Sequence, residues 1–109
     1  MDLLPIVAIR LREAREEKKL SQERLGRLAG IDEFSASARM NQYERGKHTP
    51  DYGTMQRIAA ALELPVAYFY ADTEEDAQLL RLFHRLAQNN RAKLLAYAET
   101  LRDGPSAPT

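Results

Sequence analysis

The sequence predicts an all-α protein, and two observations favour this class. Ala, Leu, Glu and Arg, which favour helix, are abundant among its 109 residues. No stretch shows the sustained alternation of apolar and polar residues that a half-buried strand requires. A chain of this length rarely holds two independent cores, so we expect one compact domain or one small domain with an appendage.

The first predicted helix spans residues 5–19. Val7, Leu11 and Ala14 recur at spacings of four and three, which places them on one stripe of a helix. Asp2 is a candidate cap for this helix. Arg15 lies at the edge of the stripe, where a partly buried charge requires a carboxylate partner.

A second, shorter helix is predicted after Ser21, whose hydroxyl is a typical N-cap. Leu25, Leu28 and Ala29 provide its buried face. Gly30 fits a left-handed stop after it.

A loop is expected over residues 31–34, followed by a third helix that begins at Ser35 as its cap and runs to about Arg45. Gly46 closes this helix. Its inward face is expected to consist of Ala36, Met40 and Tyr43.

The fourth helix is expected to open at residues 49–51, and a last short turn is expected to begin at Pro65. Together these elements make a five-helix unit, which we assign to a domain spanning residues 1–70. The inward stripe of the fourth helix is predicted to be Met55, Ile58, Ala59 and Leu62.

A helical hairpin is predicted over residues 71–103. The acidic segment 71–76 suits a linker that leads into a helix N-terminus, where negative charge is favourable. A polar break at residues 88–90 divides the hairpin into two helices. The tail, residues 104–109, has nothing to bury and is expected to be disordered. The apolar stripe of the hairpin consists of Leu79, Leu82, Phe83, Leu86, Leu94, Leu95 and Leu101.

Composition excludes several functional classes. The 16 Lys and Arg residues balance 16 Asp and Glu residues, so any attraction to a polyanion must be local. The absence of Cys excludes thiol nucleophiles and thiolate zinc sites. His48 and His84 lack a second His at metal spacing, and no glycine-rich phosphate loop is present. We therefore expect no metal, no cofactor and no enzymatic activity.

The N-terminal apolar run is shorter than the roughly 20 residues that a membrane span needs, and it lacks a basic leader. We expect a protein without a membrane partner, located in the cytoplasm and associated with the nucleoid.

The predicted third helix carries the functional signal. On the face opposite its apolar residues, small and polar side chains replace the Glu and Lys typical of a solvated helix. Ser, Asn, Gln and Arg match the donors and acceptors of base edges, and Ala can contact a thymine methyl group. The base-reading candidates are Ser37, Ala38, Arg39, Asn41 and Gln42.

Residues 10–70 resemble the helix-turn-helix domain of the Cro and phage-repressor class, also called XRE-family or lambda-repressor-like regulators. The shared segments are RLREAREEKKLSQ, SQERLGRLAG, the Tyr43–Lys47 run before Pro50, and MQRIAAALEL. The resemblance implies a five-helix DNA-binding domain of a bacterial or phage kind.

The resemblance also implies roles for individual residues. Arg15 would form a structural ion pair with Glu44. Gln22, at the N-terminus of the second helix, would bind a DNA phosphate, for which free N–H groups and the helix dipole are suited. The residues expected along the DNA backbone in the following loop are Arg45, Lys47, His48 and Thr49.

Two departures from the family pattern lie near the third helix. Between Gly30 and Glu44 the chain has about four residues more than usual, which predicts a longer turn between the second and third helices. Gly26 stands where the family usually has Ala, which leaves room for close approach of the third helix at a cost of about 1 kcal/mol in helix propensity.

The sequence thus predicts a DNA-binding transcriptional regulator, a repressor that binds an inverted-repeat operator in double-stranded DNA as a homodimer. The hairpin stripe is the expected dimer interface, because reading two half-sites requires two copies at fixed separation; alternatively, it adds a layer to the monomer core. The alternative function is a protein-interaction module, such as an antitoxin or adaptor with an unknown protein partner, in which DNA binding is secondary.

Overall fold

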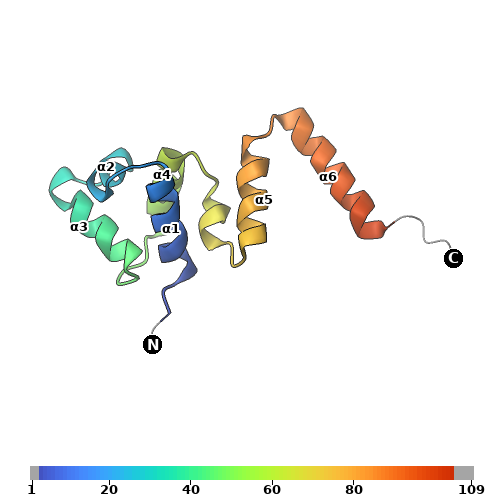
Figure 1. Cartoon of the computed structure of the whole chain (residues 1–109). Helices are drawn as coiled ribbons and strands as arrows, with labels where there is room; N and C mark the ends of the chain where they lie inside the picture. The colour runs from blue at the N-terminus through green and yellow to red at the C-terminus, as the bar shows by residue number, and fades with distance from the viewer. Residues whose placement is uncertain (1–2, 105–109) are drawn as a thin grey trace.

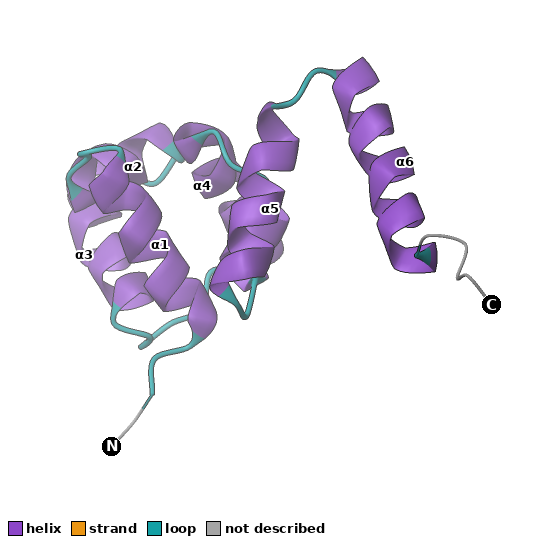
Figure 2. Cartoon of the chain, turned by 45° about the vertical axis from the view of Figure 1, so that its right-hand side comes forward, coloured by secondary structure: helices purple, strands orange, loops and turns teal. Residues whose placement is uncertain are grey.

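The computed structural model describes residues 3–104, and every regular element in that range is a helix (Figures 1 and 2). The predicted all-α class is confirmed. The candidate cap Asp2 and residues 105–109 of the predicted tail lie outside the described residues. The elements in chain order are α1 (Ile6–Glu17), α2 (Gln22–Leu28), α3 (Glu33–Glu44), α4 (Tyr52–Leu62), the 3₁₀ helix η1 (Val66–Tyr70), α5 (Glu74–Arg85) and α6 (Gln88–Asp103).

The start and the end of α2 follow the local signals in the sequence. The Ser21 hydroxyl accepts a hydrogen bond from the Arg24 N–H at 3.0 Å, which satisfies one of the free donors of the first turn. Gly30 adopts φ +84°, a left-handed conformation that glycine reaches without steric cost. Both of these end signals are confirmed. Of the predicted buried face, Leu25 and Ala29 are buried, but Leu28 is 49% exposed, so its assignment to that face is wrong.

Helix α3 begins earlier than predicted. Asp32, not Ser35, is its N-cap, because the Asp32 carboxylate accepts from the Phe34 N–H at 3.1 Å. The expected loop over residues 31–34 and the longer turn are therefore wrong. The turn is confined to residues 29–32, and the extra residues of the chain add a first turn to α3.

Helices α2 and α3 pack closely at Gly26. A Cβ placed on Gly26 would lie 2.8 Å from the Ala36 Cβ and 2.9 Å from the Ala36 carbonyl oxygen. Because two of the nearest atoms belong to the Ala36 backbone, they cannot rotate away as a flexible side chain would. Glycine at this position thus sets the separation of the two helices.

One hydrophobic core joins the helices from α1 to η1. Leu11, Leu25, Met40, Ile58 and Phe69 have 2% exposure or less and come from the five successive elements. The Asp51 carboxylate accepts from the Thr54 N–H at 2.8 Å and caps α4. All four residues of the predicted α4 stripe are buried: Met55, Ile58, Ala59 and Leu62.

The core continues past residue 70 into α5. Ala71 and Ala77 are buried in the same cluster, and α5 lies beside η1 (Figure 1). Residues 74–76 form the first turn of α5 rather than a linker, and the Thr73 hydroxyl accepts from the Asp76 N–H. Three carboxylates there complement the N-terminal end of the helix dipole.

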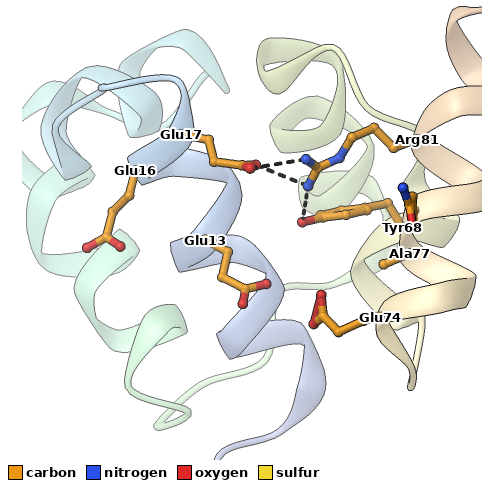
Figure 3. A pocket seen from close by; sticks show the side chains of 8 residues that line it. Glu13, Glu16, Glu17, Tyr68, Glu74, Ala77 and Arg81 are labelled. Carbon is orange, nitrogen blue, oxygen red and sulfur yellow. Dashed lines mark hydrogen bonds and ion pairs between the residues drawn. The ribbon is translucent and has the colours of Figure 1, made fainter.

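Two arginines attach α5 to α1. The Arg10 side chain is 2% exposed, and it donates to the Ala71 carbonyl at 3.1 Å and to the Glu74 carboxylate at 2.7 Å. Arg81 reaches across a cleft to the Glu17 carboxylate and donates to the Tyr68 hydroxyl at 2.7 Å, as Figure 3 shows. Burial opposes the charge of Arg10, but the hydrogen bond and charge of Glu74 outweigh it and raise the pKa of Arg10.

The break between α5 and α6 falls at Leu86 and Ala87, not at the predicted residues 88–90, which form the first turn of α6. Leu86 and Ala87 have extended backbones, so the helix cannot continue through them. The Arg91 guanidinium donates to the Phe83 carbonyl at 2.9 Å and the His84 carbonyl at 2.6 Å. These two carbonyls at the end of α5 are thereby satisfied without a continuing helix.

Helix α6 extends away from the rest of the molecule, and α5 and α6 form an open hairpin (Figures 1 and 2). No residue of α6 is buried. The Cα radius of gyration is 17.2 Å, against about 13 Å for a compact chain of this length. Within residues 3–104, no helix has both the length and the apolar character to cross a membrane.

Candidate nucleic-acid interface

The two faces of α3 differ in burial and chemistry. Ala36 and Met40 are fully buried and Tyr43 is 8% exposed, and these three side chains fasten the helix to the core. On the opposite side, apart from Phe34 in the first turn, the side chains are small or polar, and most of them are exposed. The predicted base-reading residues that are exposed are Ser37, Ala38, Arg39 and Gln42.

Asn41, the remaining base-reading candidate, is only partly exposed. Its side-chain oxygen accepts a hydrogen bond from the Gln22 amide at 3.3 Å. The same Gln22 amide nitrogen lies 3.1 Å from a Glu44 carboxylate oxygen. Gln22, at the first position of α2, therefore joins α2 to α3 within the protein.

Behind the exposed face, a buried ion pair joins α1 to the last turn of α3. The Arg15 guanidinium donates to both carboxylate oxygens of Glu44, and it also donates to the Leu20 carbonyl at 2.8 Å. The Glu44 side chain is 3% exposed and that of Arg15 is 14% exposed. Hydrogen bonding to Glu44 raises the pKa of Arg15 above its ordinary value.

The segment that leaves α3 carries the predicted backbone-contacting residues. Arg45 is the C-cap of α3, and Gly46 follows it with φ +74°. The four residues of this prediction are all exposed: Arg45, Lys47, His48 and Thr49. A polar hollow joins this loop to the α3 face, and Arg39, Gln42, His48 and Thr49 are among the residues that line it.

One carboxylate lies at the same hollow. Asp51 accepts hydrogen bonds from the Thr54 backbone and side chain, and these bonds, together with the nearby charges of Arg57 and Arg39, lower the pKa of Asp51. The Asp51 carboxylate thus acts as the cap of α4. Arg39 and His48 line the hollow beside it.

Sequence reasoning missed three residues: Arg10 and Arg81, which attach α5 to α1, and Phe34, which lies on α3. Arg10 lies on the same helical stripe as Val7, Leu11 and Ala14, so its spacing already indicates burial and a need for partners. Arg81 had no comparable signal, because its partners come from α1 and η1. Phe34, assigned to a loop, lies in the first turn of α3 and is 91% exposed.

Helices α2 and α3 are short and are joined by a four-residue turn. The buried face of α3 packs on the core, and its exposed face is mainly polar. This arrangement defines a helix-turn-helix module. The family comparison agrees with this geometry, since the model of the helix-turn-helix domain matches residues 8–75. The chain belongs to the helix-turn-helix domain family, in its XRE type.

Relatives in the same family are named as regulators. The chain is 32% identical over 72 residues to "Uncharacterized HTH-type transcriptional regulator y4aM" of Sinorhizobium fredii, covering 66% of this chain and 48% of that protein. It is 33% identical over 67 residues to y4wC, of the same description and organism, covering 62% and 44%. The matched region thus spans about half the length of these two proteins.

A solved structure extends the similarity beyond the helix-turn-helix domain. The crystal structure of the transcriptional regulator BswR is 41% identical in sequence and superposes with a TM-score of 0.77. The match covers 89% of this chain and 93% of that one.

Proposed function

We propose that this chain is a sequence-specific DNA-binding transcriptional regulator, and that it represses by occupying an inverted-repeat operator as a homodimer. The main observation in support of the proposal is the exposed polar face of α3. The buried Arg15–Glu44 pair fixes the orientation of this helix by joining its last turn to α1. The regulator names of y4aM, y4wC and BswR support the same function.

Recognition would divide between base edges and phosphates. Ser37, Ala38, Arg39 and Gln42 are suited to reading bases in the major groove, because their donors, acceptors and methyl group match the groove's pattern. Arg45 and Lys47 would neutralise phosphates beside the groove, with His48 and Thr49 as neighbouring donors. Gln22 would bind a phosphate with its backbone N–H at the N-terminus of α2, since its side-chain amide already donates to Asn41 and Glu44.

The homodimer proposal depends on the exposed apolar side chains of the C-terminal helices. In α6, Leu95 is 56% exposed and Leu101 is 63% exposed, and no residue of this helix is buried. Burying side chains of this size contributes about 1.5 to 3 kcal/mol each. A second copy that covers them would also hold two α3 helices at a fixed separation. The proposed interface residues are Leu79, Leu82, Phe83, Leu86, Leu94, Leu95 and Leu101.

Selection of bound sequences from a random DNA pool, using the full chain, tests the proposal directly. We expect enrichment of a motif with inverted symmetry and half-site centres about 34 Å apart or a multiple of that distance. Recovery of an enriched but asymmetric motif would contradict the homodimer, and recovery of no motif would contradict sequence-specific binding.

The alternative function, a protein-interaction module, is favoured by the zero net charge of the chain. A salt titration separates the two. When a protein neutralises DNA phosphates, the logarithm of its binding constant falls linearly with the logarithm of the salt concentration, with a slope of about −0.9 for each phosphate. A slope of several units supports the regulator, and a slope near zero on every duplex supports the interaction module.

A further inference from the structure

Phe34 occupies an exposed position at the start of the reading helix. At 91% exposure it is the most exposed large hydrophobic side chain among the described residues. Its backbone is fixed, because its N–H donates to the Asp32 carboxylate that caps α3. The ring is therefore presented to solvent by an ordered helical turn.

The position of Phe34 on α3 aligns it with the base-reading face. Phe34, Ala38 and Gln42 follow one another at intervals of four residues, which places them one above the other on the same side of the helix. That side is opposite the buried Ala36, Met40 and Tyr43. The phenyl ring is thus the outermost group of the same stripe, one turn closer to the N-terminus than Ala38.

We propose that Phe34 is a specificity-determining residue that contacts a thymine C5-methyl group in the major groove. This inference rests on the proposed function. The N-terminal residues of a reading helix are those that reach base edges, and the thymine methyl is the apolar group that the major groove displays. An uncharged ring has no means of binding a phosphate, so its contribution is to base identity.

The neighbouring charges favour the same assignment. Asp32 and Glu33 precede Phe34, and both are exposed. Carboxylates at this point repel phosphates, so the first turn of α3 is better placed over the open groove than over the DNA backbone. Within the groove, a carboxylate can accept a hydrogen bond from a cytosine amino group.

The test uses the full chain and the operator recovered by selection with the unmodified protein. Each thymine of the half-site is replaced in turn by deoxyuridine, symmetrically in both half-sites, and affinity is measured by fluorescence anisotropy. Deoxyuridine pairs like thymine but lacks the methyl group. The unmodified protein should lose about fourfold in affinity per methyl group at one position. Phe34→Ala should bind the thymine operator and the operator with deoxyuridine at that position with equal affinity.

Because the homodimer carries two copies of Phe34, Phe34→Ala should also bind the methylated operator at least about sixteenfold more weakly than the unmodified protein, while Phe34→Leu should be intermediate, because leucine retains part of the apolar contact. Ser35→Ala is the matched control in the same helical turn and should keep full affinity. Because the ring is exposed, melting temperatures of all three variants should equal that of the unmodified protein.

Two results would overturn the inference. In the first, Phe34→Ala binds the thymine operator as tightly as the unmodified protein. In the second, deoxyuridine lowers the affinity of Phe34→Ala as much as it lowers that of the unmodified protein, at every position. If the unmodified protein selects a motif but either result is obtained, only the role of Phe34 fails. If the unmodified protein selects no motif, the proposed function fails and the role of Phe34 fails with it.

Discussion

Arg15 and Glu44 join the first and third helices through two parallel hydrogen bonds, from Arg15 Nε to Glu44 Oε2 at 2.5 Å and from Nη2 to Oε1 at 3.0 Å. A planar guanidinium that meets a carboxylate in this way fixes orientation as well as distance. Since Glu44 ends α3, this pair sets the angle at which the exposed face of that helix is presented.

Glu44→Ala should lower the free energy of unfolding by about 3 to 5 kcal/mol, because it leaves the Arg15 charge largely buried without its partner. Urea unfolding followed by circular dichroism measures the change. Arg12→Ala, which removes an exposed pair with Glu16, is the control and should cost no more than about 0.5 kcal/mol. Equal effects of the two substitutions would show that the Arg15–Glu44 pair contributes no more than a surface pair.

Gly26→Ala should destabilise the protein, although alanine is the better helix former. The added methyl would meet the Ala36 backbone, and overpacking of this kind costs about 1 to 3 kcal/mol. Gly53 is the matched control, since a Cβ there would meet its nearest atoms at 3.7 Å or more. Gly53→Ala should therefore stabilise by up to about 1 kcal/mol. Thermal unfolding of both variants checks the opposite signs, and stabilisation by Gly26→Ala would contradict the close approach.

Acid should weaken the cap of α4. The pKa of Asp51 is lower in the folded protein than its ordinary value of 3.8, so the unfolded chain binds more protons between the two values. The contribution of Asp51 is present above the ordinary value and is lost as the pH falls through the lowered one. Asp51→Asn keeps a good cap without the titration. In unfolding titrations between pH 5 and 2, this variant should lose less stability than the unmodified protein, and parallel curves would contradict the prediction.

Arg39→Ala should cost about 1 to 3 kcal/mol of DNA-binding free energy and relax the preference at one base position, because an arginine reads guanine through two hydrogen bonds. Selection from a random pool with the variant measures the preference, and anisotropy measures the affinity. Arg12→Ala on α1 should change neither quantity. If Arg39→Ala weakens binding to every sequence equally, Arg39 contacts phosphate instead of a base.

Leu95→Lys should shift the protein from dimer to monomer, because it places a charge in the proposed apolar interface. Sedimentation equilibrium should show a dissociation constant raised at least tenfold, which corresponds to about 1.4 kcal/mol. Ala96→Lys, on the opposite side of the exposed helix α6, should leave the dimer intact. A monomeric unmodified protein at micromolar concentration would contradict the interface.

Local signals in the sequence were sufficient for the elements whose ends depend on their own residues. The Ser21 cap, the left-handed Gly30 and the apolar stripe of α4 each follow from the chemistry of neighbouring positions, and the structure agrees with all three. The same local periodicity separated the inward and outward faces of α3, because the buried residues recur at helical spacing whether the helix starts at residue 33 or 35.

Tertiary contacts decided what neighbouring residues left undetermined. Asp32 and Ser35 are both acceptable caps in isolation, and the choice of Asp32 depends on how closely α3 can follow the turn and pack on Gly26. The attachment of α5 depends on Arg10 and Arg81, whose partners Glu74 and Glu17 are 64 residues away in the sequence. The sequence by itself determined which face of α3 is polar, because burial follows helical spacing; only contacts between distant segments decided that α5 is held against α1 and η1.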